Sequence, residues 1–411
     1  MRRPPSDVAI VGAGPAGSAA AIVLRRLGRQ VVLVDKASFP RDKCCGDGLT
    51  TAALRRLQDL GLDPAAVKSW APVEGAEVVA TDGYRLDLPL PGGGQFAASA
   101  RRADLDSELV ALARRAGAHV VEGCAVTTVA EAYGGEGISV GLDDGSRIAA
   151  RYVIACDGAW SSVRRALGLT EPGYLGDWQA GRQYFDRVGP EARQLWVWFE
   201  SDMVPGYAWS FPLADGTANV GYGVIRGPGE RLGDLKGQRI DFLARPHIAA
   251  VLGSQARAVS AWKAWPIPAR IGSAPVSGLG GRVLFAGDAA RACDPMTGEG
   301  IAQAFETAEL AARAITSAGP HRPAAAAARY ERQIRWGLAV DDHLSRSLSR
   351  VLARPGGSAQ SLRLAGVSSW CRRGFARWMF EDFPRAVPAT PHRWRRGLFT
   401  GPGAYPTTGT G

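Results

Sequence analysis

Three glycines near the N-terminus have the spacing that binds a pyrophosphate. Gly12, Gly14 and Gly17 follow an apolar run at residues 8–11, which has the length of a buried parallel strand. Gly12 permits a sharp turn, Gly14 lets a phosphate approach the backbone, and Gly17 lets the next helix pack against the strand. That helix, expected over residues 16–27, would offer free N–H groups and a positive dipole end to the phosphates. We therefore predict a dinucleotide-binding site.

An acidic residue closes the second apolar run of the chain. Asp35 follows residues 31–34 and lies about 20 residues past the glycines, the position from which a carboxylate binds a ribose 2′-OH. A glycine triplet alone is weak evidence, because glycine-rich turns are common. The succession of strand, triplet, helix, strand and terminal acid is far more specific and favours a bound dinucleotide.

Two further glycine-bearing loops follow buried-strand patterns later in the chain. Asp157-Gly158 comes after residues 151–155, and Gly287-Asp288 comes after residues 282–286. With the three loops in this order, residues 6 to about 320 resemble the flavoprotein monooxygenase superfamily, of which p-hydroxybenzoate hydroxylase is the type. The resemblance implies an α/β fold with a Rossmann-type domain that binds FAD.

The resemblance also assigns parts of FAD to these loops. The first loop would bind the pyrophosphate, Asp35 the adenosine ribose and Asp288 the ribityl chain. The helix after residues 298–301 would point its N-terminus at the isoalloxazine, where its dipole would stabilise the negative charge of reduced flavin. Arg102 matches the family's arginine near FAD, with a surface helix charge as the alternative. The implied cofactor residues are Gly12, Gly14, Pro15, Ala16, Gly17, Asp35, Lys36, Cys45, Gly46, Arg102, Val126, Asp157, Gly158, Gly287, Asp288, Pro295, Gly298, Gly300 and Ile301.

Two segments narrow the resemblance to the geranylgeranyl reductases and their menaquinone-reducing relatives. Residues 43–49, Lys-Cys-Cys-Gly-Asp-Gly-Leu, are similar to the reductases' Lys-x-Cys-Gly-(Gly/Asp)-Gly segment. Residues 207–212, Tyr-Ala-Trp-Ser-Phe-Pro, are similar to their Tyr-x-Trp-x-Phe-Pro element. The implied catalytic residues are Cys45, Gly46, Tyr207 and Trp209. The first two would lie near the flavin and the two aromatics would line a prenyl pocket, whereas a purely structural interpretation makes the thiol a small buried group and the rings core side chains.

The activity that the resemblance implies is reduction of carbon–carbon double bonds in a prenyl chain or a related apolar metabolite, by hydride transfer from reduced FAD. No histidine stands near the loops, so the proton donor is not identified. NAD(P)H or another carrier would supply the electrons, and NAD(P)H would bind transiently because no separate nicotinamide fingerprint is visible.

Three other functions stay open at this point. An FAD-dependent monooxygenase acting on an aromatic or terpenoid natural product would use the same scaffold. A halogenase fits less well, because Tyr207 and Phe211 replace two positions of the Trp-x-Trp-x-Ile-Pro element of that family. A non-enzymatic, FAD-bound membrane module would rest on the basic C-terminal region alone.

Composition limits the partners of the protein. No run among the 411 residues reaches the 18 or more apolar positions of a membrane span, and residues 1–5 lack the apolar core of a signal peptide. The six scattered cysteines favour reduced thiols and a cytoplasmic protein, and no Cys/His spacing resembles a metal site. Residues 320–411 hold fifteen arginines and five acids, a surplus equal to the net charge of +10 of the whole chain.

A basic tail on a neutral body indicates a local anionic contact, and no nucleic-acid-binding motif is present. Residues 370–380 mix basic and aromatic side chains on one expected helix, as interfacial membrane segments do. Two interpretations of this helix stay open, a peripheral membrane contact and a basic face packed on its own domain. The residues concerned are Trp370, Arg372, Arg373, Phe375, Arg377, Trp378 and Phe380.

The same patterns predict the domain organisation. Residues 1–70, 98–168 and 276–320 would form the discontinuous FAD-binding domain. Residues 71–97 and 169–275 would form an inserted antiparallel β-sheet that binds substrate, with strands at 194–199, 207–211, 217–225 and 256–265. Residues 321–411 would form a C-terminal helical region, with one helix over 361–380 and a disordered tail from 401. The tryptophans of the inserted sheet, expected as a substrate wall or as core, are Trp178, Trp196, Trp198, Trp209, Trp262 and Trp265.

Overall fold

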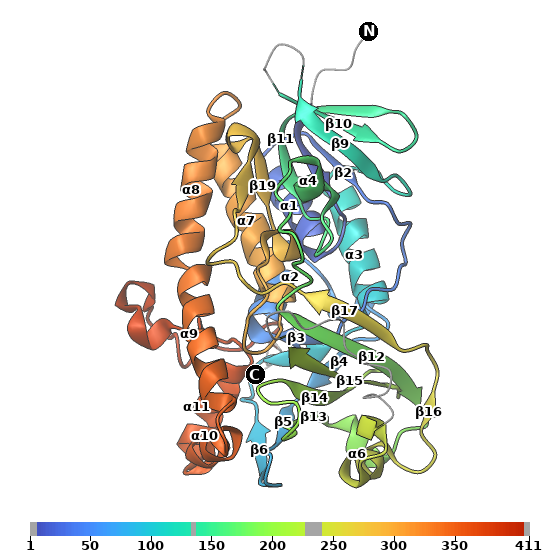
Figure 1. The fold of residues 1–411 in the computed structure, drawn as a ribbon, viewed down its shortest axis with the longest axis vertical. Coiled ribbons are helices and arrows are strands. Elements are labelled where there is room, and N and C mark those ends of the chain that lie inside the picture. The colour runs from blue at the N-terminus through green and yellow to red at the C-terminus, as the bar shows by residue number, and fades with distance from the viewer. Residues whose placement is uncertain (1–5, 133–136, 227–240, 407–411) are drawn as a thin grey trace, which may run out of the picture.

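The computed structural model describes residues 6–132, 137–226 and 241–406. Expectations for residues 1–5 and for the tail beyond 406 lie outside this part of the chain. Figure 1 shows one sheet with its helices in the upper half, a second sheet in the lower half, and the C-terminal helices along one side of both. The predicted α/β architecture, with an FAD-binding fold, a second sheet and a C-terminal helical region, is confirmed.

The first sheet has eight strands around a parallel centre. Its order is β18 (Ser277–Gly278), β19 (Val283–Phe285), β11 (Arg147–Ala155), β1 (Ser6–Val11), β2 (Val31–Val34) and β8 (His119–Val121), with β9 (Val126–Glu131) and β10 (Ile138–Leu142) added antiparallel beside β11. In the central strand Val8, Ala9 and Ile10 have no exposed surface, as expected of a strand covered on both faces. The loops after β1, β11 and β19 therefore meet at one edge, where parallel strands end.

Helices cover this sheet and carry the loops into position. They are α1 (Pro15–Arg26), α2 (Thr51–Leu60), α3 (Arg102–Arg115), α4 (Ser162–Ala166) and α7 (Ile301–Ala318). The predicted helix over residues 16–27 is confirmed within one residue at each end. A small three-stranded sheet, β3 (Gly48–Thr50), β7 (Ala97–Ser99) and β4 (Ala71–Val73), connects the two halves of the molecule.

The second sheet also has eight strands. In order they are β16 (Arg257–Ala258), β12 (Trp178–Asp186), β15 (Ala218–Ile225), β14 (Tyr207–Pro212), β13 (Leu195–Trp198), β5 (Gly75–Val79) and β6 (Arg85–Pro89), with β17 (Lys263–Ile267) also beside β12. The sheet is mixed and not purely antiparallel, because β13 and β5 pair in parallel. The strand expected over 256–265 is two short strands, and β12 and helix α6 (Pro246–Leu252) were not anticipated.

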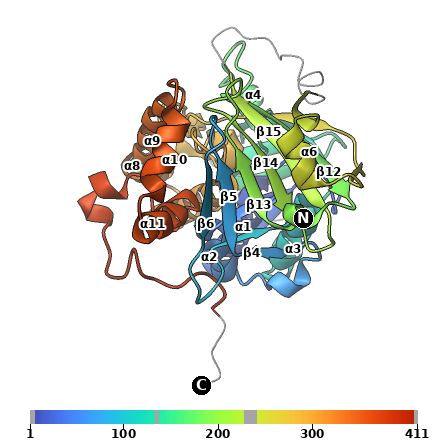
Figure 2. The same ribbon diagram turned by 90° about the horizontal axis from the view of Figure 1, so that it is seen from below.

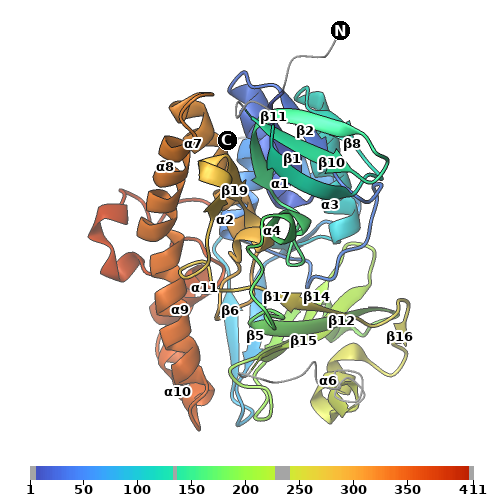
Figure 3. The same ribbon diagram turned by 45° about the horizontal axis from the view of Figure 1, so that its top comes forward.

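Four helices follow α7 and extend from the first sheet to the second: α8 (Pro323–Trp336), α9 (Leu338–Leu352), α10 (Gly357–Gly366) and α11 (Ser369–Met379). α7 and α8 lie side by side (Figure 3), and α9 to α11 gather beside β6 and β5 (Figure 2). The single helix expected over 361–380 is wrong. The chain breaks before α11, where the Ser368 hydroxyl accepts the N–H of Cys371 at 3.1 Å and caps the new helix.

The last described residues are ordered, contrary to the expectation of a disordered tail from 401. Ala404 forms a bridge with Gln95 through two backbone hydrogen bonds of 2.6 and 2.8 Å. The ring of Tyr405 packs edge-on against Trp70, with centroids 5.9 Å apart. The expectation for 407–411 lies outside the described residues.

Candidate active site

The first glycine loop has the close packing that the dinucleotide site requires. Gly12 has φ +96°, and a Cβ there would lie 2.4 Å from the Cys156 carbonyl oxygen. A Cβ at Gly17 would lie 1.7 Å from the Gly12 carbonyl oxygen. Both contacts are shorter than any real one, so only glycine lets α1 begin this close to β1. The observation fits a pyrophosphate at the N-terminus of α1.

Two guanidinium groups face this loop. A Cβ on Gly14 would lie 3.3 Å from Nη2 of Arg41 and 3.7 Å from Nη2 of Arg102. Arg102 is 7% exposed and donates to both oxygens of Asp106 at 2.8 and 2.9 Å, and Nη1 of Arg41 lies 3.2 Å from the same carboxylate. Arg102 is therefore no surface helix charge. Two cations against one carboxylate leave a net positive charge beside Gly14, which suits a diphosphate.

Asp35 lies at the end of β2, next to the glycine loop. Its Oδ2 accepts the N–H of Ala13 at 2.7 Å, and its Oδ1 accepts the N–H of Ala37 at 2.8 Å. The carboxylate thus fixes the loop, and its contact with a ribose stays a prediction. Lys36 beside it is exposed, and Val126 is buried in β9.

The second and third loops come to the same edge. Oδ2 of Asp157 accepts from Ser162 and Val163, but its buried Oδ1 has no hydrogen-bond partner among the described residues and is free for a ligand. Asp288 Oδ1 accepts from the Cys293 thiol at 3.3 Å. Between these loops lies Lys43, with its ammonium 4.2 Å from the ring centre of Trp265. Burial lowers the pKa of Lys43, and the charge of Asp288 partly offsets this. The four segments form one cradle whose donor set fits FAD.

A buried carboxylate supports the loop that carries Cys45. Asp47, with φ +65° and no exposed surface, accepts from the hydroxyl of Tyr184 at 2.6 Å and from Nδ2 of Asn219 at 2.8 Å. Burial raises the pKa of Asp47 to about 6, although these two hydrogen bonds oppose the increase. Asn219 also donates to the Cys45 carbonyl at 2.9 Å and accepts the indole N–H of Trp209 at 3.0 Å. The side-chain amide of Asn219 therefore fixes the relative positions of the Cys45 loop, Asp47 and Trp209.

Cys45 is a neutral thiol in this setting. Burial raises its pKa to about 12, although the charge of Arg102 partly opposes this. Its sulfur accepts the N–H of Asp47 at 3.3 Å. A thiolate is the reactive form of cysteine, so the environment does not activate Cys45 as a nucleophile. Gly46 lies against the aromatic strand β14, since a Cβ there would be 3.5 Å from the rings of both Trp209 and Phe211.

An apolar cavity of about 230 Å³ lies next to this loop. Strands β5, β13 and β14 form one wall with Val78, Leu195, Val197, Phe199, Tyr207 and Phe211, and helices α9 to α11 form the other with Leu348, Val351, Leu352, Leu362, Phe375 and Trp378. Val351 is 41% exposed, so the cavity reaches the surface beside α9. Of the predicted pocket residues, Tyr207 lines it.

Trp209 does not line the cavity but is buried behind Tyr207 with 6% of its surface exposed. None of the six tryptophans expected as a wall, all in the described part of the chain, contributes to the lining. Trp196 and Trp198 stack on each other at 5.5 Å within a separate core. The core interpretation therefore holds for Trp178, Trp196, Trp198 and Trp209, which are buried. Trp262 and Trp265 are only partly buried, and the Trp265 ring lies against Lys43 at the cradle.

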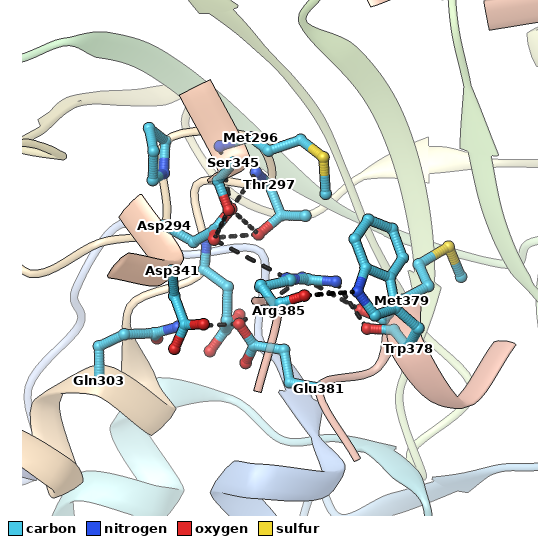
Figure 4. Close-up of polar contacts among 12 residues, drawn as sticks. Asp294, Met296, Thr297, Gln303, Asp341, Ser345, Trp378, Met379, Glu381 and Arg385 are labelled. Carbon is cyan, nitrogen blue, oxygen red and sulfur yellow. Dashed lines mark hydrogen bonds and ion pairs between the residues drawn. The ribbon is translucent and has the colours of Figure 1, made fainter. Parts of the chain in front are cut away.

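One end of the cavity is polar, where Glu299 and Arg385 line it. Arg385 is 3% exposed and donates to the carbonyls of Trp378 at 2.6 Å and Met379 at 3.3 Å. Figure 4 shows its guanidinium between Asp294 and Glu381, at 3.8 and 3.6 Å. These contacts join the segment after α11 to the loop that precedes α7.

Glu299 lies directly before α7 and turns its carboxylate back to the helix. Its Oε1 accepts the N–H of Ile301 at 3.0 Å. Burial raises the pKa of Glu299 to about 8, and repulsion by the negative charge of Glu381 adds to the effect. Both effects favour the neutral form of this carboxyl at the polar end of the cavity.

Comparison with known proteins identifies the family. The model of the FAD binding domain family matches residues 5–333. A menaquinone reductase of Mycolicibacterium smegmatis is 34% identical over 84% of this chain and 82% of its own. The chain belongs to the geranylgeranyl reductase family of FAD-dependent oxidoreductases.

One further relative agrees with this assignment, and a solved structure shares the fold. Digeranylgeranylglycerophospholipid reductase 1 of Methanopyrus kandleri is 31% identical over 80% of this chain and 85% of its own. The crystal structure of a geranylgeranyl bacteriochlorophyll reductase-like protein from Thermoplasma acidophilum superposes with a TM-score of 0.76 at 22% identity, covering 95% of this chain and 99% of the other. The predicted family and the predicted class of enzyme are confirmed, and the roles of individual site residues in the family member described here stay predictions.

The structure brings together most of the residues that the sequence singled out in this reductase-family chain. The glycine loops, Arg102 and the Cys45 loop converge on one cradle, while Lys36 faces solvent. Sequence reasoning missed Tyr184, Asn219 and Arg385, which carry no motif. Asp47 and Glu299 stood inside the quoted motifs, but their burial could not be recognised without the structure.

Proposed function

We propose that this enzyme reduces a double bond in the prenyl chain of a membrane quinone of the menaquinone type. The observation that supports this most directly is the apolar cavity between β14 and α11, which adjoins both the Cys45 loop and the N-terminus of α7. Pockets for whole drug-sized ligands occupy about 300–1,000 Å³. A cavity of about 230 Å³ accepts a segment of a chain, and the opening at Val351 lets the remainder extend outward.

The residues of the cradle would hold FAD, which when bound supplies hydride chemistry. The backbone of residues 12–17 with Arg41 and Arg102 would bind the pyrophosphate, and Asp157 and Asp288 would bind the remaining polar groups. Electrons would come from NAD(P)H or another reduced carrier that binds transiently.

The protein's own part is to exclude water and orient the alkene. The Tyr207 hydroxyl donates to the Thr297 carbonyl, which fixes its ring at the cavity wall. Asn219 accepts the indole N–H of Trp209, and this hydrogen bond holds the Trp209 ring next to Gly46.

An anaerobic single turnover tests the proposal. Enzyme reduced with dithionite is mixed with menaquinone or with a digeranylgeranyl lipid, and flavin reoxidation and product mass are followed. We expect flavin oxidation with menaquinone and a gain of two hydrogens per reduced bond that remains after the quinol ring is reoxidised to the quinone, since reduction of the ring alone also adds two hydrogens. Oxidation by the lipid alone would assign the enzyme to the other substrate class, and a product heavier by one oxygen, formed only in air, would establish the monooxygenase alternative.

A pair of variants on α10 links turnover to the cavity. Leu362 lines the cavity and is 2% exposed, whereas Leu364 two positions later is 71% exposed. Leu362→Trp should fill the cavity and abolish reoxidation by the prenyl substrate, while Leu364→Trp serves as the control. Equal activity of the two variants would show that the substrate binds elsewhere.

We also propose that the corner between α10 and α11 contacts an anionic membrane. Leu364, Val367 and Trp370 are 71–77% exposed, and the side chains of Arg363 and Arg373 are exposed beside them. Arginines next to exposed apolar groups are the chemistry of an interfacial anchor. Among the described residues no helix is long and apolar enough to cross a membrane.

The anchor differs from the one expected over residues 370–380, because that segment does not present a single face. Phe375 and Trp378 line the cavity, and Arg377 is buried against Asp382. Trp370→Ala should weaken flotation with anionic liposomes, and Trp336→Ala, which removes a 62% exposed indole on α8, is the matched control. No preference for anionic over neutral lipid would disprove the contact.

A further inference from the structure

Acidic groups outnumber basic ones at the polar end of the cavity. Glu299, Glu381 and Asp294 lie there with one cation, Arg385. The ionisable side chains around Glu299 are Glu381, Asp294, Arg385, Tyr207, Cys45 and Cys293. Burying three negative charges beside one positive charge is unfavourable, so one carboxyl in this cluster retains a proton.

Hydrogen bonding shows which carboxyl that is. Asp294 accepts four bonds, from the N–H groups of Met296 and Thr297 at 2.9 and 2.8 Å and from the hydroxyls of Thr297 and Ser345 at 3.0 and 2.7 Å (Figure 4). Such a set of donors stabilises the ionised form.

Glu381 is similarly supplied with donors. It accepts from the hydroxyl of Thr50 at 2.9 Å and from Nε2 of Gln303 at 2.8 Å, and Arg385 lies beside it. Glu299 receives only backbone N–H groups at the start of α7, and among the described residues no side chain donates to it. Burial raises the pKa of both Glu381 and Glu299, but side-chain partners oppose the increase only at Glu381, so the geometry favours the proton on Glu299.

We propose that Glu299 is the proton donor for reduction of the double bond, a role that rests on the proposed function. Among the described residues that line the cavity Glu299 is the one carboxylic acid, and it lies at the N-terminus of α7. FAD held in the cradle would, in its reduced form, supply a hydride with its electron pair to one alkene carbon. The O–H bond of Glu299 breaks and a C–H bond forms at the other carbon, leaving a carboxylate that water reprotonates.

Substitution of Glu299 tests the role in two independent ways. In the wild type we expect the rate of single-turnover reoxidation to fall above about pH 8. In Glu299→Gln we expect an unchanged flavin spectrum, a loss of 100-fold or more in that rate, and no such fall with pH. Without FAD or substrate, the infrared band of a protonated carboxyl at pH 7 should be present in the wild type and absent in the variant. Glu309→Gln, on the outer part of the same helix, is the control.

The neighbouring Glu381 supplies a second variant in case Glu299→Gln loses FAD. Its charge raises the pKa of Glu299, so Glu381→Gln should move the fall in rate to lower pH without abolishing turnover. A rate within threefold of wild type in Glu299→Gln, or an unchanged pH profile in both variants, would disprove the role of Glu299 while leaving the reductase activity intact. A wild type that reduces no prenyl substrate would instead refute the proposed function.

Discussion

The hydroxyl of Tyr184 offers a measurable test of how Asp47 supports the Cys45 loop. Tyr184→Phe removes a 2.6 Å hydrogen bond to a carboxyl with no exposed surface but keeps the ring, which lies 4.3 Å from the guanidinium of Arg182. A hydrogen bond to a charged group contributes about 1.5–3 kcal/mol to the free energy of unfolding, and one to a neutral group about 1 kcal/mol. The decrease in the free energy of unfolding caused by Tyr184→Phe should thus depend on whether Asp47 is ionised.

The pH dependence follows from the direction of the pKa shift. Burial raises the folded-state pKa of Asp47 to about 6 from 3.8, so the folded protein binds more protons than the unfolded chain between these values, and stability falls as pH rises through that window. Loss of the Tyr184 hydroxyl removes an interaction that lowers the pKa of Asp47. The pH range over which stability falls should therefore extend upward by about one pH unit, which corresponds to ~1.4 kcal/mol in the free energy of unfolding. We expect Tyr184→Phe to destabilise the protein by about 2 kcal/mol at pH 8 and by about 1 kcal/mol at pH 5.

Urea unfolding at the two pH values measures the difference. Tyr174→Phe is a matched control, because that hydroxyl donates to Asp177 at 2.5 Å in a comparable site. Although burial opposes it, hydrogen bonds from Arg270 and Tyr174 keep the pKa of Asp177 below its ordinary value, so it stays ionised from pH 5 to 8 and the control should lose equal stability at both. If Tyr184→Phe loses the same stability at pH 5 and pH 8, or loses more at pH 5, the role given to Asp47 is wrong.

Three other variants address the cradle, the thiol and the C-terminal segment. Gly14→Val should abolish retention of FAD on desalting, because its side chain would point toward Arg41 where the pyrophosphate belongs; a retained flavin spectrum would contradict the assignment. Cys45→Ala should keep FAD and the melting temperature but slow substrate-dependent reoxidation, whereas loss of FAD would mark a packing role. Asp382→Asn should cost about 3 kcal/mol of stability in urea unfolding, since it breaks a buried carboxylate shared by Arg55 and Arg377; a loss below 1 kcal/mol would show that the pairs are not needed.

The cofactor cradle could be predicted from the sequence because short-range rules determine it. A buried strand reads as an apolar run, and the turn after β1 demands glycine at Gly12 and Gly17 for reasons that involve only neighbouring backbone. Strand β12 was missed because it buries polar side chains. Arg182 has no exposed surface and pairs with Asp42, and Gln183 donates to the Ser260 carbonyl at 2.5 Å. Because these partners come from remote segments of the chain, the sequence of β12 does not show the apolar pattern that predicts a buried strand.

The cavity wall could likewise be predicted from the sequence only in part. The aromatic element of β14 was recognised, and the pleat places Tyr207, Trp209 and Phe211 on one face of the strand. Which of these rings reach the cavity depends instead on remote packing partners, because Asn219 binds the Trp209 indole while Tyr207 lines the cavity and Trp209 does not. The break before α11 depends on one capping serine, and Arg385 belongs to no motif. The cap is a local contact that the helical periodicity hides, whereas Arg385 became recognisable only through its contact with Asp294.

The two walls of the cavity come from different parts of the sequence. The FAD binding domain match ends at residue 333, whereas α9, α10, α11 and Arg385 all lie beyond it and supply the whole side that faces β13 and β14. The wall formed by α9 to α11 can therefore vary in sequence while the three glycine loops of the cradle stay the same. If the cavity binds the substrate as proposed, exchange of these helices between relatives would alter one wall of the substrate site and leave the cofactor loops intact.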